Sequence, residues 1–302
     1  MKPQHVGLVV AIADAGSLGG AARQLNKTQS AITKALKNAE MDLGTRIFHR
    51  SPTGVMPTVE GQGVVDRCRR ILRDLELLDE AVAQTRGDFV GSLNVIVSPF
   101  AAMKIMPGVL RQFCRQYPRV QLEISGGLPP SSFRSLKTGQ ADIVIGPEPV
   151  SDAKTGLQSK QMFHTGTTII TGATSRYLGV SDPKILSQAS WITTGAHDRK
   201  QLADGYFESQ GLTPPKPVLY SDSILTILSA LEGSNLLCSF PTALLEEASK
   251  RWALGKIDLD IASTSVTIAI TTTQGHRPTP ASVAFMDLVI SEAAHLMGSA
   301  HN

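Results

Sequence analysis

The sequence predicts three structural parts: a small, mainly helical domain over residues 1–58, one long helix over 59–86, and, after a hinge at 87–92, an α/β body over 93–302. Three observations predict this organisation. Basic residues concentrate in the first part, an apolar stripe with helical spacing runs through the second, and short β-type runs alternate with helical stretches in the third. The 302 residues are enough for more than one hydrophobic core.

The charge of the chain is distributed unevenly. The formal net charge is +3. Residues 1–58 contain seven Lys and Arg against three Asp and Glu, which makes this part +4 and leaves the rest of the chain at −1. A basic module on a nearly neutral body predicts a polyanionic partner for that module.

Composition also argues against several protein classes. The sequence has no apolar run of about 18 residues, so we expect no membrane span, and its first residues lack a signal-peptide pattern, so we expect a cytoplasmic protein. Cys68, Cys114 and Cys238 lie far apart, which indicates reduced thiols and neither disulfides nor a metal site. A redox-sensing role for one of them stays open as the alternative, and no cofactor is expected.

Capping residues divide the first part into helices. After a first apolar helical pattern, Ser17 is a suitable N-cap for a short helix over 18–25. Thr28 can then cap a third helix that reaches Leu43, with Gly44 as its C-terminal stop. Two helices joined by a short turn form the helix-turn-helix arrangement.

The third helix has one polar face with the chemistry of DNA recognition. Ser30, Thr33, Lys34 and Lys37 have helical spacing and share the side opposite its apolar stripe. Gln29 and Thr33 carry donors and acceptors suited to base edges, and the lysines can neutralise phosphates. The alternative is a helical hairpin with an ordinary solvated face.

A predicted wing favours the DNA-binding alternative. Residues 45–50 have the pattern of a strand, 51–54 that of a turn, and 55–57 that of a return strand. This arrangement would bring Arg50 and the turn to a sugar-phosphate backbone. The residues expected to meet double-stranded DNA are Ser17, Thr28, Gln29, Ser30, Thr33, Lys34, Lys37, Arg50 and Thr53.

The stretch AARQLNKTQSAITKALKNAEMDLGTRIFHR, residues 21–50, resembles the N-terminal signature of LysR-type transcriptional regulators. The residues that carry the resemblance are Ala21, Ala22, Leu25, Gln29, Ser30, Ala31, Thr33, Leu36, Glu40, Leu43, Gly44, Phe48 and Arg50. The chain departs from the family at Gly19 and Gly20, where the family often has side chains directed toward DNA, and at Ala39, where leucine is usual. The resemblance implies a winged helix-turn-helix domain.

The helix over 59–86 has an apolar seam of alternating four- and three-residue spacings, which is typical of a coiled coil. We expect the seam to pair two subunits through Val64, Cys68, Ile71, Leu75, Leu78 and Val82. Charged residues such as Arg70 and Glu80 lie off the seam and are expected to be solvated. At about 1.5 Å per residue, the helix would be an arm of about 40 Å. A helix packed on its own domain is the alternative.

The body shows repeated β-α units. Strand patterns occur at 93–97, 120–124, 142–145, 168–171, 217–220, 236–239 and 266–270, with helices between them. This order predicts mostly parallel sheets covered by helices on both faces. The family resemblance implies two lobes folded like the periplasmic solute-binding proteins, with lobe I at about 93–163 and 266–302 and lobe II at about 164–265.

A small ligand is expected between these lobes, at the carboxyl ends of strands and beside helix N-termini. The residues that this rule selects are Ser98, Pro99, Phe100, Gly126, Gly127, Thr193, Thr194, Asp222, Phe240 and Pro241. Hydroxyls and helix N-termini suit a small acid or another polar metabolite, and a neutral sugar fits almost as well.

A ligand-responsive transcriptional regulator is therefore the predicted function. A hydrolase is the rival class, but no G-x-S-x-G, H-E-x-x-H or phosphate-loop motif occurs, so no catalytic residue is assigned. A solute-binding transport protein is the second rival, which the basic N-terminal module argues against. The expected partners are operator DNA, a small inducer, a second copy of the chain and, as a further candidate, RNA polymerase. The family resemblance implies that two such dimers form a tetramer.

Overall fold

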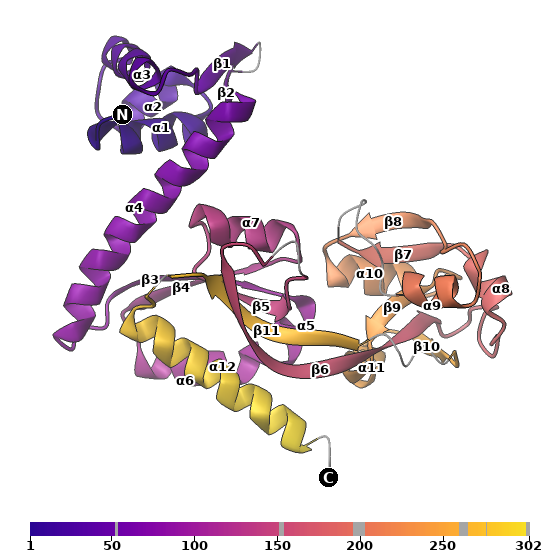
Figure 1. Ribbon diagram of the computed structural model, residues 1–302. Helices are drawn as coiled ribbons and strands as arrows, with labels where there is room; N and C mark the ends of the chain where they lie inside the picture. Colours follow the sequence, from indigo (N-terminus) through magenta and orange to yellow (C-terminus); the bar gives the residue numbers. More distant parts are fainter. Residues whose placement is uncertain (52–53, 151–153, 196–202, 260–264, 276, 300–302) are drawn as a thin grey trace.

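The computed structural model describes residues 1–302 except 52–53, 151–153, 196–202, 260–264, 276 and 300–302. A small N-terminal domain is joined by the long helix α4 to a body whose two lobes lie side by side, with β6 and β11 passing from one lobe to the other (Figure 1).

The N-terminal domain contains three helices, α1 (Gln4–Ala15), α2 (Leu18–Gln24) and α3 (Gln29–Leu43). The expected caps are present: the Ser17 hydroxyl accepts from Gly20 N and the Thr28 hydroxyl from Ala31 N. Gly44 ends α3 in the left-handed conformation, with φ of 66°, which glycine adopts without strain. Ile12, Ala21 and Ile32, one from each helix, are completely buried in a common core.

The wing is the antiparallel pair β1 (Phe48–Ser51) and β2 (Gly54–Pro57). The first strand begins three residues later than predicted. The cause is Glu40, whose carboxylate accepts hydrogen bonds from the backbone N–H groups of Ile47 (2.8 Å) and Phe48 (3.2 Å). These bonds attach the start of the wing to α3.

Helix α4 (Val59–Thr85) begins at the Thr58 cap, whose hydroxyl accepts from Gly61 N. Its first turns pack against α1 and bury Val65 and Cys68 in the core of the N-terminal domain. Its later turns lie against α7 and α12 of the body. The helix therefore contacts both folded parts of its own chain.

Lobe I is built on a sheet in which β3 (Gly91–Val97) pairs in parallel with β4 (Val120–Gly126) and with β5 (Ile143–Pro147). Strand β3 begins inside the stretch predicted as a hinge. Helices α6 (Met106–Gln116) and α12 (Pro280–Ser299) lie on one face of the sheet, and α7 (Ser131–Thr138) lies on the other (Figure 1).

Two long strands, β6 (Leu157–Gly172) and β11 (Ser265–Thr273), pair antiparallel and join the lobes. The N-terminal part of β6 pairs with β11. Its C-terminal part pairs antiparallel with two other strands, β9 (Cys238–Pro241) and β10 (Leu254–Ile257). The expectation of mostly parallel sheets is therefore wrong. The chain enters lobe II along β6 and leaves it along β11. Because these two neighbouring strands run in opposite directions between the lobes, they pair antiparallel.

Lobe II contains a second, two-stranded parallel sheet of β7 (Trp191–Thr194) and β8 (Pro217–Ser221). Its helices are short: α8 (Pro183–Ser187), α9 (Asp204–Ser209), α10 (Ile224–Leu231) and α11 (Thr242–Ser249).

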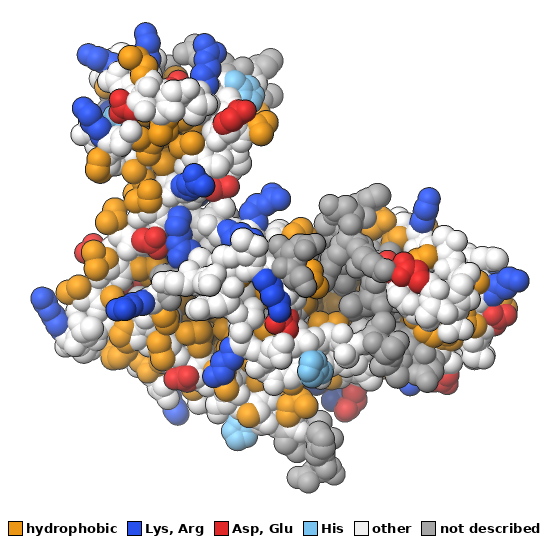
Figure 2. Space-filling model, in the orientation of Figure 1, with side chains coloured by type: hydrophobic (Ala, Val, Ile, Leu, Met, Phe, Trp, Pro, Cys, Tyr) orange, Lys and Arg blue, Asp and Glu red, His pale blue; other side chains and the backbone are white. Residues whose placement is uncertain are grey.

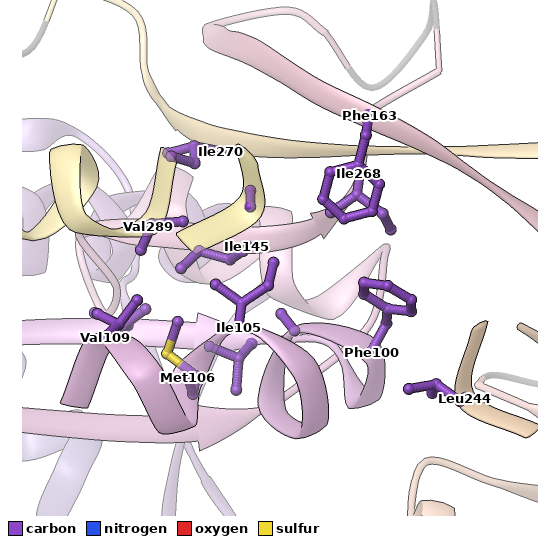
Figure 3. Packing of buried hydrophobic residues seen from close by; sticks show 14 of the residues in the cluster. Phe100, Ile105, Met106, Val109, Ile145, Phe163, Leu244, Ile268, Ile270 and Val289 are labelled. Carbon is purple, nitrogen blue, oxygen red and sulfur yellow. The ribbon is translucent and has the colours of Figure 1, made fainter. Parts of the chain in front are cut away.

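The main core lies under the lobe I sheet and continues into lobe II. Ile105, between α5 (Pro99–Lys104) and α6, and Met106, the first residue of α6, pack near Ile145 of the sheet (Figure 3). Phe100 points toward Phe163 of β6 in the same view, with the two ring centroids 5.5 Å apart. Among the described residues, no helix has both the length and the apolar character needed to cross a membrane.

Candidate nucleic-acid interface and ligand pocket

The exposed face of α3 is the candidate nucleic-acid interface. Gln29, Ser30, Thr33, Lys34 and Lys37 are all exposed. The Thr33 hydroxyl donates to the backbone oxygen of Gln29 at 2.8 Å, which leaves its oxygen lone pair and its methyl group for an outside partner. The face therefore presents an amide, two hydroxyls and two ammonium groups.

Ser17 and Thr28 contribute to the same surface in a different way. Both hydroxyls cap helices, at 3.1 Å from Gly20 N and 3.2 Å from Ala31 N. The Thr28 hydroxyl also lies 3.1 Å from that of Ser30. Their first role is to fix where α2 and α3 begin.

Each acidic residue of this domain has a partner outside the α3 face. Asp14 forms an ion pair with Arg69 of α4, and the Glu40 carboxylate is bonded to the backbone of the wing. Asp42 lies 3.6 Å from the N-terminal ammonium. Lys34 and Lys37 form no ion pair with a residue that the structure describes, and Figure 2 shows Lys and Arg side chains around this end of the molecule.

The wing is described only in part. Arg50 lies in β1, paired with Val55 of β2, and Thr53 falls outside the described residues.

A pocket of about 90 Å³ lies between the two lobes. It is lined from the N-terminus of α5, the ends of β5, β7 and β9, the starts of α10 and α11, the crossing strands and the loop after β4. The lining residues are Ser98, Pro99, Phe100, Leu128, Pro147, Thr165, Thr167, Thr193, Thr194, Ile224, Ser239, Phe240, Pro241, Leu244, Val266 and Ile268.

Seven of the ten residues predicted to bind an effector line this pocket: Ser98, Pro99, Phe100, Thr193, Thr194, Phe240 and Pro241. Gly126 and Gly127 line a separate hollow beside α7, and only Leu128, the next residue along the chain, reaches the interlobe pocket from this end of β4, the edge strand of the sheet. Asp222 follows β8 but is not among the pocket residues.

Sequence reasoning missed the part of the lining that the crossing strands supply. Thr165 and Thr167 come from β6, and Val266 and Ile268 from β11. The rule that ligands meet the ends of strands does not select residues in the middle of a strand. In a strand, Thr165 and Thr167 point to the same face, so their alternation with Gly166 is a signal of a shared polar surface. The sequence alone does not show that β11 pairs beside them, so the signal could not be assigned to the pocket.

The polar groups of the pocket are hydroxyls. Among the sixteen described lining residues none has an ionisable side chain. The Ser98 hydroxyl accepts from Ala101 N and so caps α5. The Ser239 hydroxyl is buried and has no hydrogen-bond partner among the described residues.

One face of α4 is apolar and uncovered. Ile71, Leu75, Leu78 and Val82 are between 46% and 60% exposed, and apolar side chains are visible along the outer side of α4 in Figure 2. The predicted seam is wrong at Cys68, which is 1% exposed and packs in the core of the N-terminal domain. Val64 is partly buried against the same core.

The opposite face of α4 is bonded to lobe I. Arg73, 5% exposed, donates to both carboxylate oxygens of Asp142 at 3.0 and 2.8 Å and to the Ser92 backbone oxygen at 2.8 Å. Glu80, predicted to be solvated, is instead held 3.3 Å from Arg73 and accepts from Ser92 N. Arg70 donates to lobe I as well.

The charge of Arg73 is stabilised by this network. Burial alone would lower the pKa of Arg73. The hydrogen bond and charge of Asp142, followed by Glu80 and Glu76, outweigh burial and raise that pKa above its ordinary value. The side chain therefore stays cationic at the contact between α4 and the body.

Comparisons with known proteins match the chain along its length. Residues 3–62 match the family described as bacterial regulatory helix-turn-helix protein, lysR family, and residues 86–294 match the LysR substrate binding domain. The regulator GalR of Pseudomonas putida is 27% identical over 267 residues, which cover 88% of this chain and 67% of GalR.

Two solved structures have a similar fold. ArgP from Mycobacterium tuberculosis aligns with a TM-score of 0.71 and 17% identity over 97% of each chain. Full-length CbnR in a complex with its target DNA aligns with a TM-score of 0.65 and 20% identity, over 97% of this chain and all of CbnR.

Proposed function

The chain belongs to the LysR family of DNA-binding transcriptional regulators, and we propose that its α3 face reads operator DNA while its interlobe pocket binds the small molecule that controls it. One observation supports the DNA-reading surface above all. The α3 face is exposed and basic, while the acidic side chains of the domain are bonded elsewhere.

In this proposal Gln29 and Thr33 contact base edges in the major groove, and Lys34 and Lys37 contact phosphates. Ser17 and Thr28 orient the two helices. Arg50 and Thr53 of the wing meet the backbone of the same duplex.

The experiment compares point variants on an operator selected from a random DNA pool. Gln29→Ala should reduce discrimination between operator and random DNA by about 1–3 kcal/mol, the usual value of a good base contact. Lys34→Ala should weaken binding to all DNA and reduce its salt dependence, because one fewer counterion is released. Lys137→Ala, in α7 of the body, is the charge-matched control. Equal operator affinity and salt dependence in all three variants would refute this interface.

We further propose that the uncovered apolar face of α4 pairs two subunits, and that two such dimers form a tetramer. Ile71, Leu75 and Leu78 have coiled-coil spacing and are exposed in the single chain, so pairing would remove them from water. Replacing Ile71 and Leu75 by aspartate should abolish pairing, because a buried unpaired charge is strongly unfavourable. Light scattering that finds the same oligomer in this double variant would contradict the proposal.

A ligand in the pocket would contact residues of both lobes and would therefore favour one arrangement of the lobes over others. Because α4 is bonded to lobe I through Arg73 and to the N-terminal domain through Arg69, a change in lobe I would move the DNA-binding domain with it. We propose that this coupling alters contacts with operator DNA and with RNA polymerase, in the cytoplasm where both are found. A ligand that stabilises the protein in thermal unfolding but leaves operator binding unchanged would contradict the coupling.

A further inference from the structure

The interlobe pocket is mainly apolar. Ten of its sixteen described lining residues are Pro, Phe, Leu, Ile or Val. Phe100 from lobe I and Leu244 from lobe II both line it. Val266 and Ile268 of β11 add a branched apolar surface. Such walls favour a ligand whose body is apolar, since contact with them removes apolar surface from water on both sides.

Some hydroxyls of the pocket already form one interaction within the protein. Ser98 accepts from Ala101 N at 3.3 Å, and Thr165 lies 3.4 Å from the Gly166 oxygen. Thr167 also has an interaction within the chain. Each of these hydroxyls keeps further hydrogen-bonding capacity, but the apolar side chains of the walls offer no partners to a ligand with hydroxyl groups on all sides, and its unpaired groups would oppose binding.

Ser239 differs from these residues. Ser239 of β9 lines the pocket, and its hydroxyl is buried without a hydrogen-bond partner among the described residues. A buried hydroxyl that lacks a partner is unfavourable, so a ligand that supplies one gains affinity there. Helix α11 starts two residues after Phe240, and no side chain caps it, so its first backbone N–H groups add donors at the same end of the pocket.

The size of the pocket limits the ligand. A cavity needs about 10–15 Å³ to hold one water molecule. If each non-hydrogen atom of a ligand takes the space of one water molecule, the 90 Å³ of this pocket accommodates on the order of six to nine such atoms.

From these observations we propose that the ligand is a compact molecule with an apolar ring or branched aliphatic body and a single hydrogen-bond-accepting end, which lies against Ser239. Sugars, polyols and dicarboxylates have polar groups at more than one end and fit these apolar walls less well. This inference depends on one part of the proposed function, namely that this pocket is the effector site. It narrows the sequence-based expectation of a small acid or another polar metabolite to molecules with an apolar body.

The experiment uses the full-length chain and probes with equal numbers of non-hydrogen atoms. Benzyl alcohol, 4-methylpentanamide and 4-methylpentanoate have an apolar body and one polar end. Erythritol and succinate are the polar counterparts. Binding is measured by ligand-observed NMR titration, and we expect the first three probes to bind and the last two to bind at least tenfold more weakly.

Ser239→Ala and Ser132→Ala form a matched pair of variants. Each removes a buried hydroxyl that has no partner in the described part of the chain, but Ser132 lies in α7, outside the pocket. Neither variant should lose stability, since removing an unpaired buried hydroxyl leaves nothing unsatisfied. Ser239→Ala should weaken binding of the apolar-bodied probes by roughly three- to tenfold, the value of one hydrogen bond, and Ser132→Ala should leave it unchanged.

Three results would overturn the proposed ligand class: no binding by any of the three apolar-bodied probes, binding of erythritol or succinate with equal affinity, or equal effects of the two serine variants. Operator binding is measured on the same samples. Intact operator binding with no probe binding contradicts the ligand class alone. Probe binding that leaves operator affinity unchanged supports the ligand class and contradicts the regulatory role of the pocket.

Discussion

Replacing Arg73 by methionine should lower the free energy of unfolding by about 3–5 kcal/mol. Arg73 is 5% exposed, and it makes a two-point contact with Asp142, whose side chain is 6% exposed. Methionine keeps much of the apolar stem but removes the charge, so Asp142 and Glu80 remain buried without their cation. The loss should lie near the lower end of the range, because Asn94 N still donates to Asp142 and Ser92 N still donates to Glu80.

The assay is urea unfolding followed by circular dichroism, with hydrogen exchange to locate the effect. We expect faster exchange in the later turns of α4 and in β3, since Arg73 joins these two elements. Arg119→Met is the control, because the ion pair of Arg119 with Asp88 has both side chains more than 60% exposed and should contribute about 0–1 kcal/mol.

A second variant separates the lost pairing from a general disruption. In Arg73→Met/Asp142→Asn the buried charge of Asp142 is removed as well, so part of the stability should return. If Arg73→Met unfolds at the same urea concentration as Arg119→Met, the attachment of α4 to lobe I contributes nothing measurable and the reasoning is refuted.

Three further changes have local effects. Gly61→Ala should destabilise the N-terminal domain in thermal unfolding, because a Cβ there would overlap the carbonyl oxygen of Ile47. Gly63→Ala has open space around it and should stabilise α4 by up to about 1 kcal/mol. Equal effects of the two variants would contradict the close packing at Gly61. Iodoacetamide at pH 8 should modify the exposed Cys114 and spare Cys238, since burial raises the pKa of Cys238 to about 12 and keeps its thiol protonated. Mass spectrometry that finds both cysteines modified in the folded protein would contradict this prediction. Ser17→Ala should lower stability by about 1 kcal/mol by removing the α2 cap, and an unchanged melting temperature would rule out that role.

The sequence alone determined the features that depend on neighbouring residues. The caps at Ser17 and Thr28 and the stop at Gly44 lie where they were predicted, because each acts on backbone groups within one helical turn. The face shared by Lys34 and Lys37 follows from helical spacing in the same way.

The tertiary structure decided which apolar positions are covered. Cys68 and Ile71 occupy equivalent places in the seam, yet one is buried against the N-terminal domain and the other is 46% exposed. Glu80 has the sequence environment of a solvated residue, but it lies against Arg73. Spacing along one helix defines a face, and only the packing of a second element shows whether that face is covered.

The ligand pocket was partly predictable for a related reason. Ser98 follows a strand pattern that is visible locally, Thr194 comes soon after the apolar pair Trp191-Ile192, and a general rule places ligands at the carboxyl ends of strands. Thr165 and Val266 enter the pocket because β6 and β11 pair in one register, Thr165 opposite Val266. Pairing between strands far apart in the sequence depends on the fold of everything between them, and local sequence patterns contain no record of it.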